Sequence, residues 1–213
     1  LIVVSIIAIL SVALVVVLDP AETLRKSRDA QRISDMTSMK TALGLYLTST
    51  TTPFLGGLAN NDACKATPTG AYVSGDKIFY SLPGANTITD ADVDGGTTSN
   101  PDPWNVATPA LTDSTGWIPV NFDTLTGGSP ISNLPIDPVN TISNLAIVAS
   151  TDLVYRYACS VTPLAFEMDA QLESTAYTST DDKRTKDGGN STYYYEVGTN
   201  LKIMGATAGG VDF

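Results

Sequence analysis

"LIVVSIIAILSVALVVVLDPAETLRKSRDAQRIS", residues 1–34, joins an uncharged apolar segment to a strongly charged one. Residues 1–18 contain no charged side chain, and as an α-helix they would be about 27 Å long, close to the hydrocarbon thickness of a bilayer. A helix that is apolar all round must be buried, either in lipid or among other protein. This segment therefore predicts a membrane anchor, an uncleaved signal, or a surface through which copies of the chain associate.

The start of the chain does not follow the pattern of a cleavable signal peptide. Such a peptide carries basic residues before its apolar run and a small-residue cleavage site after it. Neither is found in residues 1–20, and no initiator Met precedes Leu1. We therefore expect an N-terminus that has been processed or shortened.

A second, amphipathic helix is predicted over residues 21–50. Asp19 is suited to cap it, Pro20 to occupy its first turn, and Glu22 lies at the third position after the cap. Proline also disfavours a regular helix through this point, so Pro20 is the predicted helix break. Apolar residues then recur at helical spacing at Leu24, Ile33, Met36, Met39, Leu43, Tyr46 and Leu47. We expect Met36, Leu43 and Tyr46 to face a sheet, and the helix to end near Thr48.

Residues 51–213 have the character of a loop-rich β head domain. "AFEMDAQLE" (165–173) and "DLVYRYACSV" (152–161) alternate apolar and polar residues, which predicts half-buried antiparallel strands joined by a hairpin with Pro163 at its edge. "STYYYEVGTNLKIMG" (191–205) suggests another hairpin, and "AYVSGDKIFYSL" (71–82) and "GWIPVNF" (116–122) are weaker strands. The predicted fold class is α+β: a long N-terminal helix packed on an antiparallel sheet of about four or five strands.

The distribution of charge restricts the function. The net charge is −10, and residues 41–213 carry eighteen acidic but only seven basic side chains. An acidic body repels phosphate backbones, so direct binding of nucleic acid is not expected. The chain contains no histidine, which removes the commonest general base and most zinc sites. We therefore expect a protein that is not an enzyme.

Two cysteines, Cys64 and Cys159, lie ninety-five residues apart. Two buried free thiols would be typical of a cytosolic protein, whereas two cysteines of an exported protein usually form a bridge. The composition and the N-terminal segment favour export, and therefore a disulfide. In the chain-entropy description, closing a loop of this length stabilises the fold by roughly 4–5 kcal/mol.

"DADVDGG" places Asp90, Asp92 and Asp94 at the alternate positions of a calcium-binding loop. The twelfth position is Pro101 instead of the glutamate that completes an EF-hand, so Ca²⁺ at these three residues competes with a solvated acidic turn. A second acidic stretch, "TSTDDKRTKDGGNS" (178–191), has basic residues among its acids, and a charged surface loop is the better interpretation. No other cofactor is indicated.

"LIVVSIIAIL", followed by a proline and "RDAQRISDMTSMKTALGLY", resembles the N-terminal helix of bacterial type IV pilins and pseudopilins. Members of that family begin with a methylated stretch of the form F-T-L-I-E, which is absent here together with its acidic residue. The resemblance covers about the first fifty residues. It implies an extracellular filament, or fimbrium, that serves cell adhesion, built from identical subunits in a helical homopolymer. It also implies an inner-membrane pool before assembly and a pilus assembly machinery.

In this family the apolar segment forms the filament core. The resemblance assigns residues 1–20 as an apolar assembly or transmembrane segment, with the cluster Arg25–Arg32 at lipid headgroup level before assembly and facing acidic neighbours afterwards. The side chains that it places in the core are Leu1, Ile2, Val3, Val4, Ile6, Ile7, Ile9, Leu10, Val12, Leu14, Val15, Val16 and Leu18.

Two other functions remain open from the sequence. A type II secretion pseudopilin would share the fold, and a complete C-terminal calcium site would favour it. A singly membrane-anchored adhesin or lectin would keep its apolar segment in lipid, and Trp104 and Trp117 could supply a sugar-binding platform, although such residues more often cap a small core.

Overall fold

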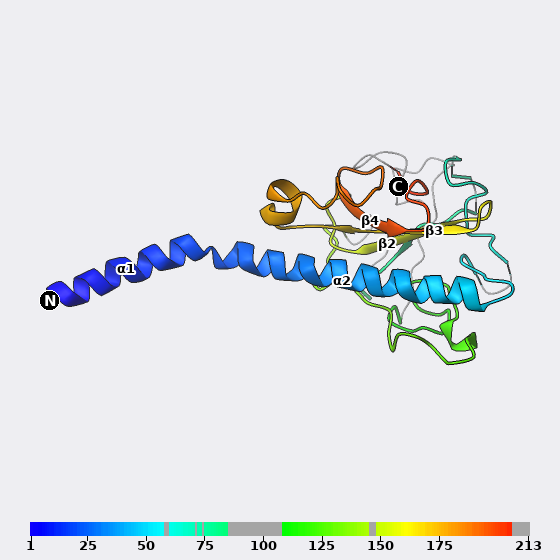
Figure 1. The fold of residues 1–213 in the computed structure, drawn as a ribbon, viewed down its shortest axis with the longest axis horizontal. Coiled ribbons are helices and arrows are strands. Elements are labelled where there is room, and N and C mark those ends of the chain that lie inside the picture. Colours follow the sequence, from blue (N-terminus) through cyan, green and yellow to red (C-terminus); the bar gives the residue numbers. More distant parts are fainter. Residues whose placement is uncertain (58–59, 71, 74, 85–107, 145–147, 206–213) are drawn as a thin grey trace.

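The structure of the chain is a computed structural model that describes residues 1–57, 60–70, 72–73, 75–84, 108–144 and 148–205. It has an α+β fold in which an N-terminal helical segment precedes and packs on an antiparallel sheet of four strands. The fold class predicted from the sequence is confirmed. The second helix, the sheet and the loops around them form what we call the body, and the first helix projects from it (Figure 1).

Two helices account for residues 2–49. Helix α1 spans Ile2–Leu18 and helix α2 spans Pro20–Ser49, so the helical path is interrupted at Asp19. Asp19 has a left-handed backbone (φ 34°), and its carboxylate accepts a hydrogen bond from the backbone N of Glu22 at 3.2 Å. Figure 1 shows the two helices following one long line with a bend at this point. The Asp19 cap and Pro20 therefore begin α2, and α1 and α2 still follow one line with a bend between them.

The four strands pair in the order β1-β2-β3-β4, all antiparallel. They are β1 (Phe79–Tyr80), β2 (Tyr155–Ser160), β3 (Ala165–Gln171) and β4 (Tyr194–Gly198). Strands β2 and β3 form the predicted hairpin, with Ser160 opposite Ala165, and Pro163 lies in the turn outside both strands. This pairing places Tyr157 opposite Met168 on the face of the sheet that looks toward α2.

The main core lies where α2 meets this face. Met36, Leu43 and Tyr46 are buried, as the helical spacing predicted. Residues 108–144 pass along another side of α2 (Figure 1), and Phe122 from this segment packs its ring edge-on against Tyr46, with 5.9 Å between ring centroids. Helix α2 is therefore packed against the sheet and against loops. Further members of this core are Met39, Ala42, Leu55, Trp117, Ile118, Val120, Leu134, Tyr155, Phe166 and Val197.

The prediction that β2 and β3 are half-buried is wrong. The alternation is present, but the face away from α2 is buried as well, because a second core lies there. Every residue of β2 is buried, including Arg156, and so are Glu167 and Asp169 of β3. Alternation predicted the two faces correctly, whereas the cover over the second face comes from segments distant in sequence.

One hairpin prediction and one strand prediction are wrong, and a further strand prediction is confirmed in part. Residues 199–205 do not pair with β4 in a hairpin; Thr199 donates its backbone N–H to Phe166 O instead, and the chain crosses the second face of the sheet. "GWIPVNF" contributes buried core residues and the start of the short helix η2 (Phe122–Thr124), without a strand. In "AYVSGDKIFYSL", strand β1 comprises only two residues.

Candidate assembly surface and its attachment to the body

Residues 1–12, at the start of the chain and in the described part of α1, expose their large apolar side chains on all sides of the helix. The large apolar residues from Ile2 to Val12 are between 51% (Ile6) and 77% (Ile2) exposed. Isolated apolar residues on a surface are ordinary, but a continuous apolar patch of this extent indicates a contact with lipid or protein. The described exposed members are Leu1, Ile2, Val3, Val4, Ile6, Ile7, Ile9, Leu10 and Val12. Leu14, Val15, Val16 and Leu18 also belong to α1, and their side chains lie outside the described part.

The hydroxyl groups of the two serines in this part of α1 form hydrogen bonds within the chain. The Ser5 hydroxyl donates to Ile2 O at 2.8 Å, and the Ser11 hydroxyl donates to Ile7 O at 2.7 Å. Because neither hydroxyl needs an outside partner, the helix can enter an apolar environment without leaving a side-chain donor unpaired. We call the exposed apolar surface of residues 1–12 the assembly surface.

Arg32 attaches α2 to the body through a buried network of charges. Its guanidinium donates to both oxygens of Asp137 (Nε–Oδ2 2.7 Å, Nη2–Oδ1 2.9 Å), to Asp29 at 2.8 Å and to Glu173 at 2.6 Å. The side chains of Arg32, Asp29 and Asp137 are fully buried. Arg28 adds a two-pronged pair with Glu173, at 2.8 Å for both contacts. Hydrogen bonds from Arg28, then Arg32, lower the pKa of Glu173.

The same network reaches the backbone at the end of β3. The Asp29 carboxylate accepts from the backbone N–H groups of Glu173 and Ser174, the shortest contact being 2.7 Å. Six residues further along α2, Asp35 accepts a hydrogen bond from the Tyr155 hydroxyl at 2.8 Å. The helix that continues α1 is thus joined to the sheet by charge-assisted bonds, which are stronger than neutral ones.

This network corrects the interpretation of the basic cluster Arg25–Arg32. Two of its four cations are committed within the chain: Arg32 is fully buried, and Arg28 pairs with Glu173. The partner carboxylates come from positions 137 and 173, and nothing in the local spacing of α2 indicates them. Only Arg25 and Lys26 remain as exposed cations of the original four.

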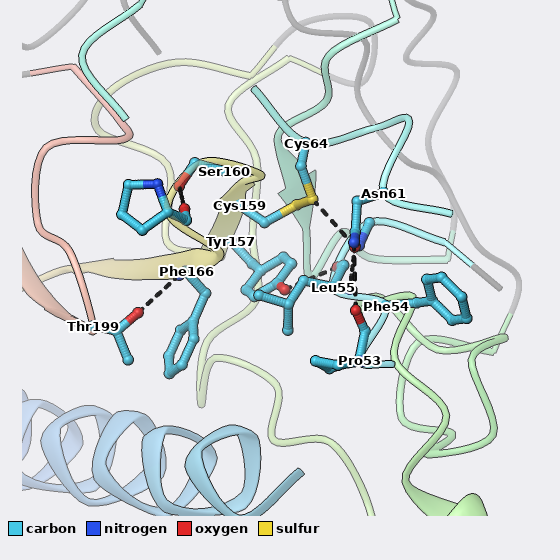
Figure 2. Close-up of a disulfide and its surroundings, with 12 residues drawn as sticks. Pro53, Phe54, Leu55, Asn61, Cys64, Tyr157, Cys159, Ser160, Phe166 and Thr199 are labelled. Atoms are coloured by element: carbon cyan, nitrogen blue, oxygen red, sulfur yellow. Dashed lines mark hydrogen bonds between the residues drawn. A yellow bond between two sulfur atoms is a disulfide. The ribbon is translucent and has the colours of Figure 1, made fainter. Parts of the chain in front are cut away.

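A disulfide fixes the chain just beyond the other end of α2. Cys64 and Cys159 are bridged, so the favoured prediction is confirmed. Figure 2 shows the bridge beside Asn61, whose side-chain oxygen accepts the backbone N–H of Leu55 at 2.6 Å. The Tyr157 hydroxyl donates to Leu55 O at 2.9 Å. The segment leaving α2 is thereby fastened to β2, which gives the body a second attachment far from the bend at Asp19.

Two acidic stretches were considered for calcium, residues 90–94 and residues 178–191. Asp90, Asp92 and Asp94 lie outside the described part of the chain. Within the described ranges, no group of three or more acidic or cysteine side chains is placed to hold a metal. In the second acidic stretch, Asp181 pairs with Lys183 and Lys186, and Asp182 pairs with Arg184, as expected for a charged surface loop.

Buried carboxyl groups on the second face of the sheet were missed by the sequence analysis. Glu167 Oε2 accepts from the backbone N–H groups of Ile203 (2.6 Å) and Met204 (2.9 Å). Burial and the neighbouring Glu196 carboxyl raise the pKa of Glu167 to about 10. Burial also raises the pKa of Asp169 to about 6 despite the nearby Arg156 guanidinium. Because these acids alternate with apolar residues, the sequence pattern is that of a strand with one face exposed to solvent.

Trp117 is not placed to form a sugar-binding platform. Trp117 is fully buried, and its indole N–H donates to Pro135 O at 2.9 Å. Its ring lies 6.3 Å from that of Tyr155, within the core between sheet and loops. Trp104 lies outside the described residues.

Comparison of the chain with models of protein families, with curated proteins and with solved structures finds no match. Judged by length and apolarity, no helix in the described ranges qualifies as a membrane crossing.

Proposed function

We propose that this chain is a structural subunit of an extracellular filament of the type IV pilus class, which polymerises through α1. The observation that carries the proposal is the assembly surface, which is apolar on all sides and projects from a folded body (Figure 1). Apolar surface of this extent is driven out of water, because its burial is favourable in proportion to its area. Identical copies provide the simplest cover, since a parallel bundle of α1 helices enclosed by the bodies of the subunits buries the apolar surface of every copy.

The attachments of α2 suit a subunit that carries load along its helix. A force applied to α1 passes through Asp19 to α2, and from α2 into the body through the contacts of Arg32 with Asp137 and Glu173. The disulfide holds the segment after α2 independently of that network. Before assembly, the proposal places α1 in contact with inner-membrane lipid, from which the pilus assembly machinery transfers it to the filament core. Apolar surface then stays buried in both states.

The test is to shear the cell-surface fraction and image it by cryo-electron microscopy. We expect helical filaments whose core is a bundle of α1 helices and whose outer surface is the body. Ile9→Asp should abolish filaments because it introduces a charge into the packed core. Val161→Asp is the matched control, since Val161 is an exposed valine in the turn after β2. A protein that is found only as detergent-extracted single copies would refute the subunit proposal and favour a singly anchored surface protein.

A further inference from the structure

A cavity of about 250 Å³ opens at the end of the body opposite α1. It lies between residues 50–57, which leave α2, and residues 119–124, which include η2. Figure 1 shows η2 beside the last turns of α2, far from the bend at Asp19. The cavity therefore belongs neither to the assembly surface nor to the charge network of Arg32.

The apolar walls of this cavity are held in place by the core. Tyr46 is only 4% exposed, its ring packs against that of Phe122, and its hydroxyl accepts the backbone N–H of Phe54 at 3.1 Å. Phe54 is half-buried, and Figure 2 shows its ring turned away from the disulfide. Pro119 lines the opposite segment and is buried. Walls that are already fixed spare a ligand the free-energy cost of ordering them.

Polar groups with unused hydrogen-bonding capacity line the same cavity. The Asn121 side-chain oxygen accepts the backbone N–H of Asp123 at 3.0 Å, and within the described ranges no protein group accepts from the Asn121 amide nitrogen. The hydroxyls of Thr50 and Thr52 likewise have no partner in the described part of the protein. None of the described residues that line the cavity is charged. The lining therefore offers amide and hydroxyl groups beside aromatic and proline carbons.

These features select a neutral ligand that has both apolar faces and hydroxyl groups. An ion would find no opposite charge in the described lining, and a purely apolar ligand would cover the amide and the hydroxyls without replacing their hydrogen bonds to water. A pyranose ring meets both requirements, because its C–H face packs on aromatic carbons while its hydroxyls exchange hydrogen bonds with amide and threonine groups. The volume lies below the range of about 300–1,000 Å³ typical of pockets for drug-sized ligands, so it suits a single ring.

We propose that this cavity binds one neutral pyranose unit, either as a simple glycoside or as the end of a glycan. Phe54 and Pro119 supply the apolar contact, and Asn121, Thr50 and Thr52 supply the hydrogen bonds. The inference goes beyond the filament proposal and does not depend on it, since no residue of α1 lines the cavity. It also uses neither of the tryptophans that the sequence suggested as a sugar platform.

The experiment is saturation-transfer NMR, in which magnetisation passes from the full chain to a bound sugar. The chain is kept in an amine-oxide detergent, because maltoside detergents would themselves present a sugar. The probes are the methyl glycosides of glucose, galactose, mannose, N-acetylglucosamine and N-acetylgalactosamine, each at up to about 10 mM. We expect at least one of them to bind with a dissociation constant of about 1 mM, the affinity of a ligand with so few atoms.

Two variants locate the bound sugar. Asn121→Asp removes the amide donor and keeps an oxygen that can accept from Asp123, and it should weaken binding by at least about 5-fold. Thr52→Trp places a large ring over the cavity at an exposed position and should abolish binding. Asn133→Asp and Thr151→Trp are the matched controls, since both residues are exposed and lie outside the cavity, and they should bind like the wild type.

The outcomes separate this inference from the filament proposal. Failure of every glycoside to bind the wild type would overturn it. Binding that survives both Asn121→Asp and Thr52→Trp, or that falls equally in the matched controls, would place the sugar elsewhere and would also overturn it. Ile9→Asp, which tests the filament proposal at the opposite end of the molecule, should leave glycoside binding unchanged, so either proposal can fail without the other.

Discussion

Replacing Arg32 by methionine should destabilise the body by about 3–5 kcal/mol, because it leaves buried carboxylates without their cation. Arg32 contacts Asp29, Asp137 and Glu173 through four hydrogen bonds of 2.6 to 2.9 Å. Methionine preserves most of the side-chain volume, so the loss measures charge and hydrogen bonding more than packing. Arg28→Met is the control: its side chain is 32% exposed, and an exposed pair of this kind contributes about 1 kcal/mol or less.

The assay is urea unfolding of the full chain in a mild detergent at neutral pH, followed by the fluorescence of buried Trp117. With a slope of about 2 kcal/mol per molar, the midpoint for Arg32→Met should fall by about 2 M urea, with an unchanged slope. The midpoint for Arg28→Met should fall by less than about 0.5 M.

Acid should narrow the difference between wild type and Arg32→Met. The pKa of Glu173 is lowered in the folded chain by Arg28 and Arg32. A carboxyl with a lowered pKa contributes stability above its unfolded pKa and loses that contribution as the pH falls through the folded value. The two proteins should therefore converge below about pH 4. A destabilisation under about 1 kcal/mol, or one equal to that of Arg28→Met, would refute the view that Arg32 is the main attachment of α2.

Three further perturbations test other parts of the fold. Replacing Cys64 and Cys159 together by alanine should cost roughly 4–5 kcal/mol, measured as the loss in unfolding free energy, and a reductant should make the wild type match the variant. Because the pKa of Glu167 is raised in the folded chain, this carboxyl takes up a proton on folding. Its contribution to the free energy of unfolding is therefore complete in acid and is lost as the pH rises toward about 10. Glu167→Gln should flatten this decline between about pH 7 and 10, and parallel curves of stability against pH for the two proteins would contradict the argument. Gly189→Ala should destabilise the fold by about 1–3 kcal/mol, because the added Cβ would lie 2.0 Å from the buried Glu196 carboxylate. Gly44→Ala in α2 has open space around the added Cβ and should stabilise the fold by about 0.5–1 kcal/mol. Thermal unfolding of both variants gives the comparison.

Features that depend on neighbouring residues could be predicted from the sequence. The apolar character of residues 1–18 requires no partner to be recognised, and Asp19-Pro20 with Glu22 determines where α2 begins. The alternation in β2 and β3 separates Tyr157 from Arg156 and Met168 from Glu167, and the structure places the two sets on opposite faces of the sheet. In each case one periodicity, 3.6 or 2, carries the information within a few residues. The α+β class follows from these local patterns.

Features that depend on distant pairing were decided only by the tertiary structure. Arg32 meets Asp137 and Glu173 across separations of 105 and 141 residues, so a cluster predicted to be at the surface is partly interior. Glu167 is buried because residues 199–205 cross the second face of the sheet, which the strand pattern does not reveal.

The basic residues after the apolar segment show the same division between local and distant information. The sequence by itself determined that cations follow the apolar segment, but the fold buries Arg32 against Asp137 and pairs Arg28 with Glu173. Hydrophobic periodicity specifies which side of an element is buried, and it does not specify which charged groups meet when the elements pack. The contacts between charged side chains depend on chain topology, because a charged group can be buried only where a partner compensates for its lost hydration.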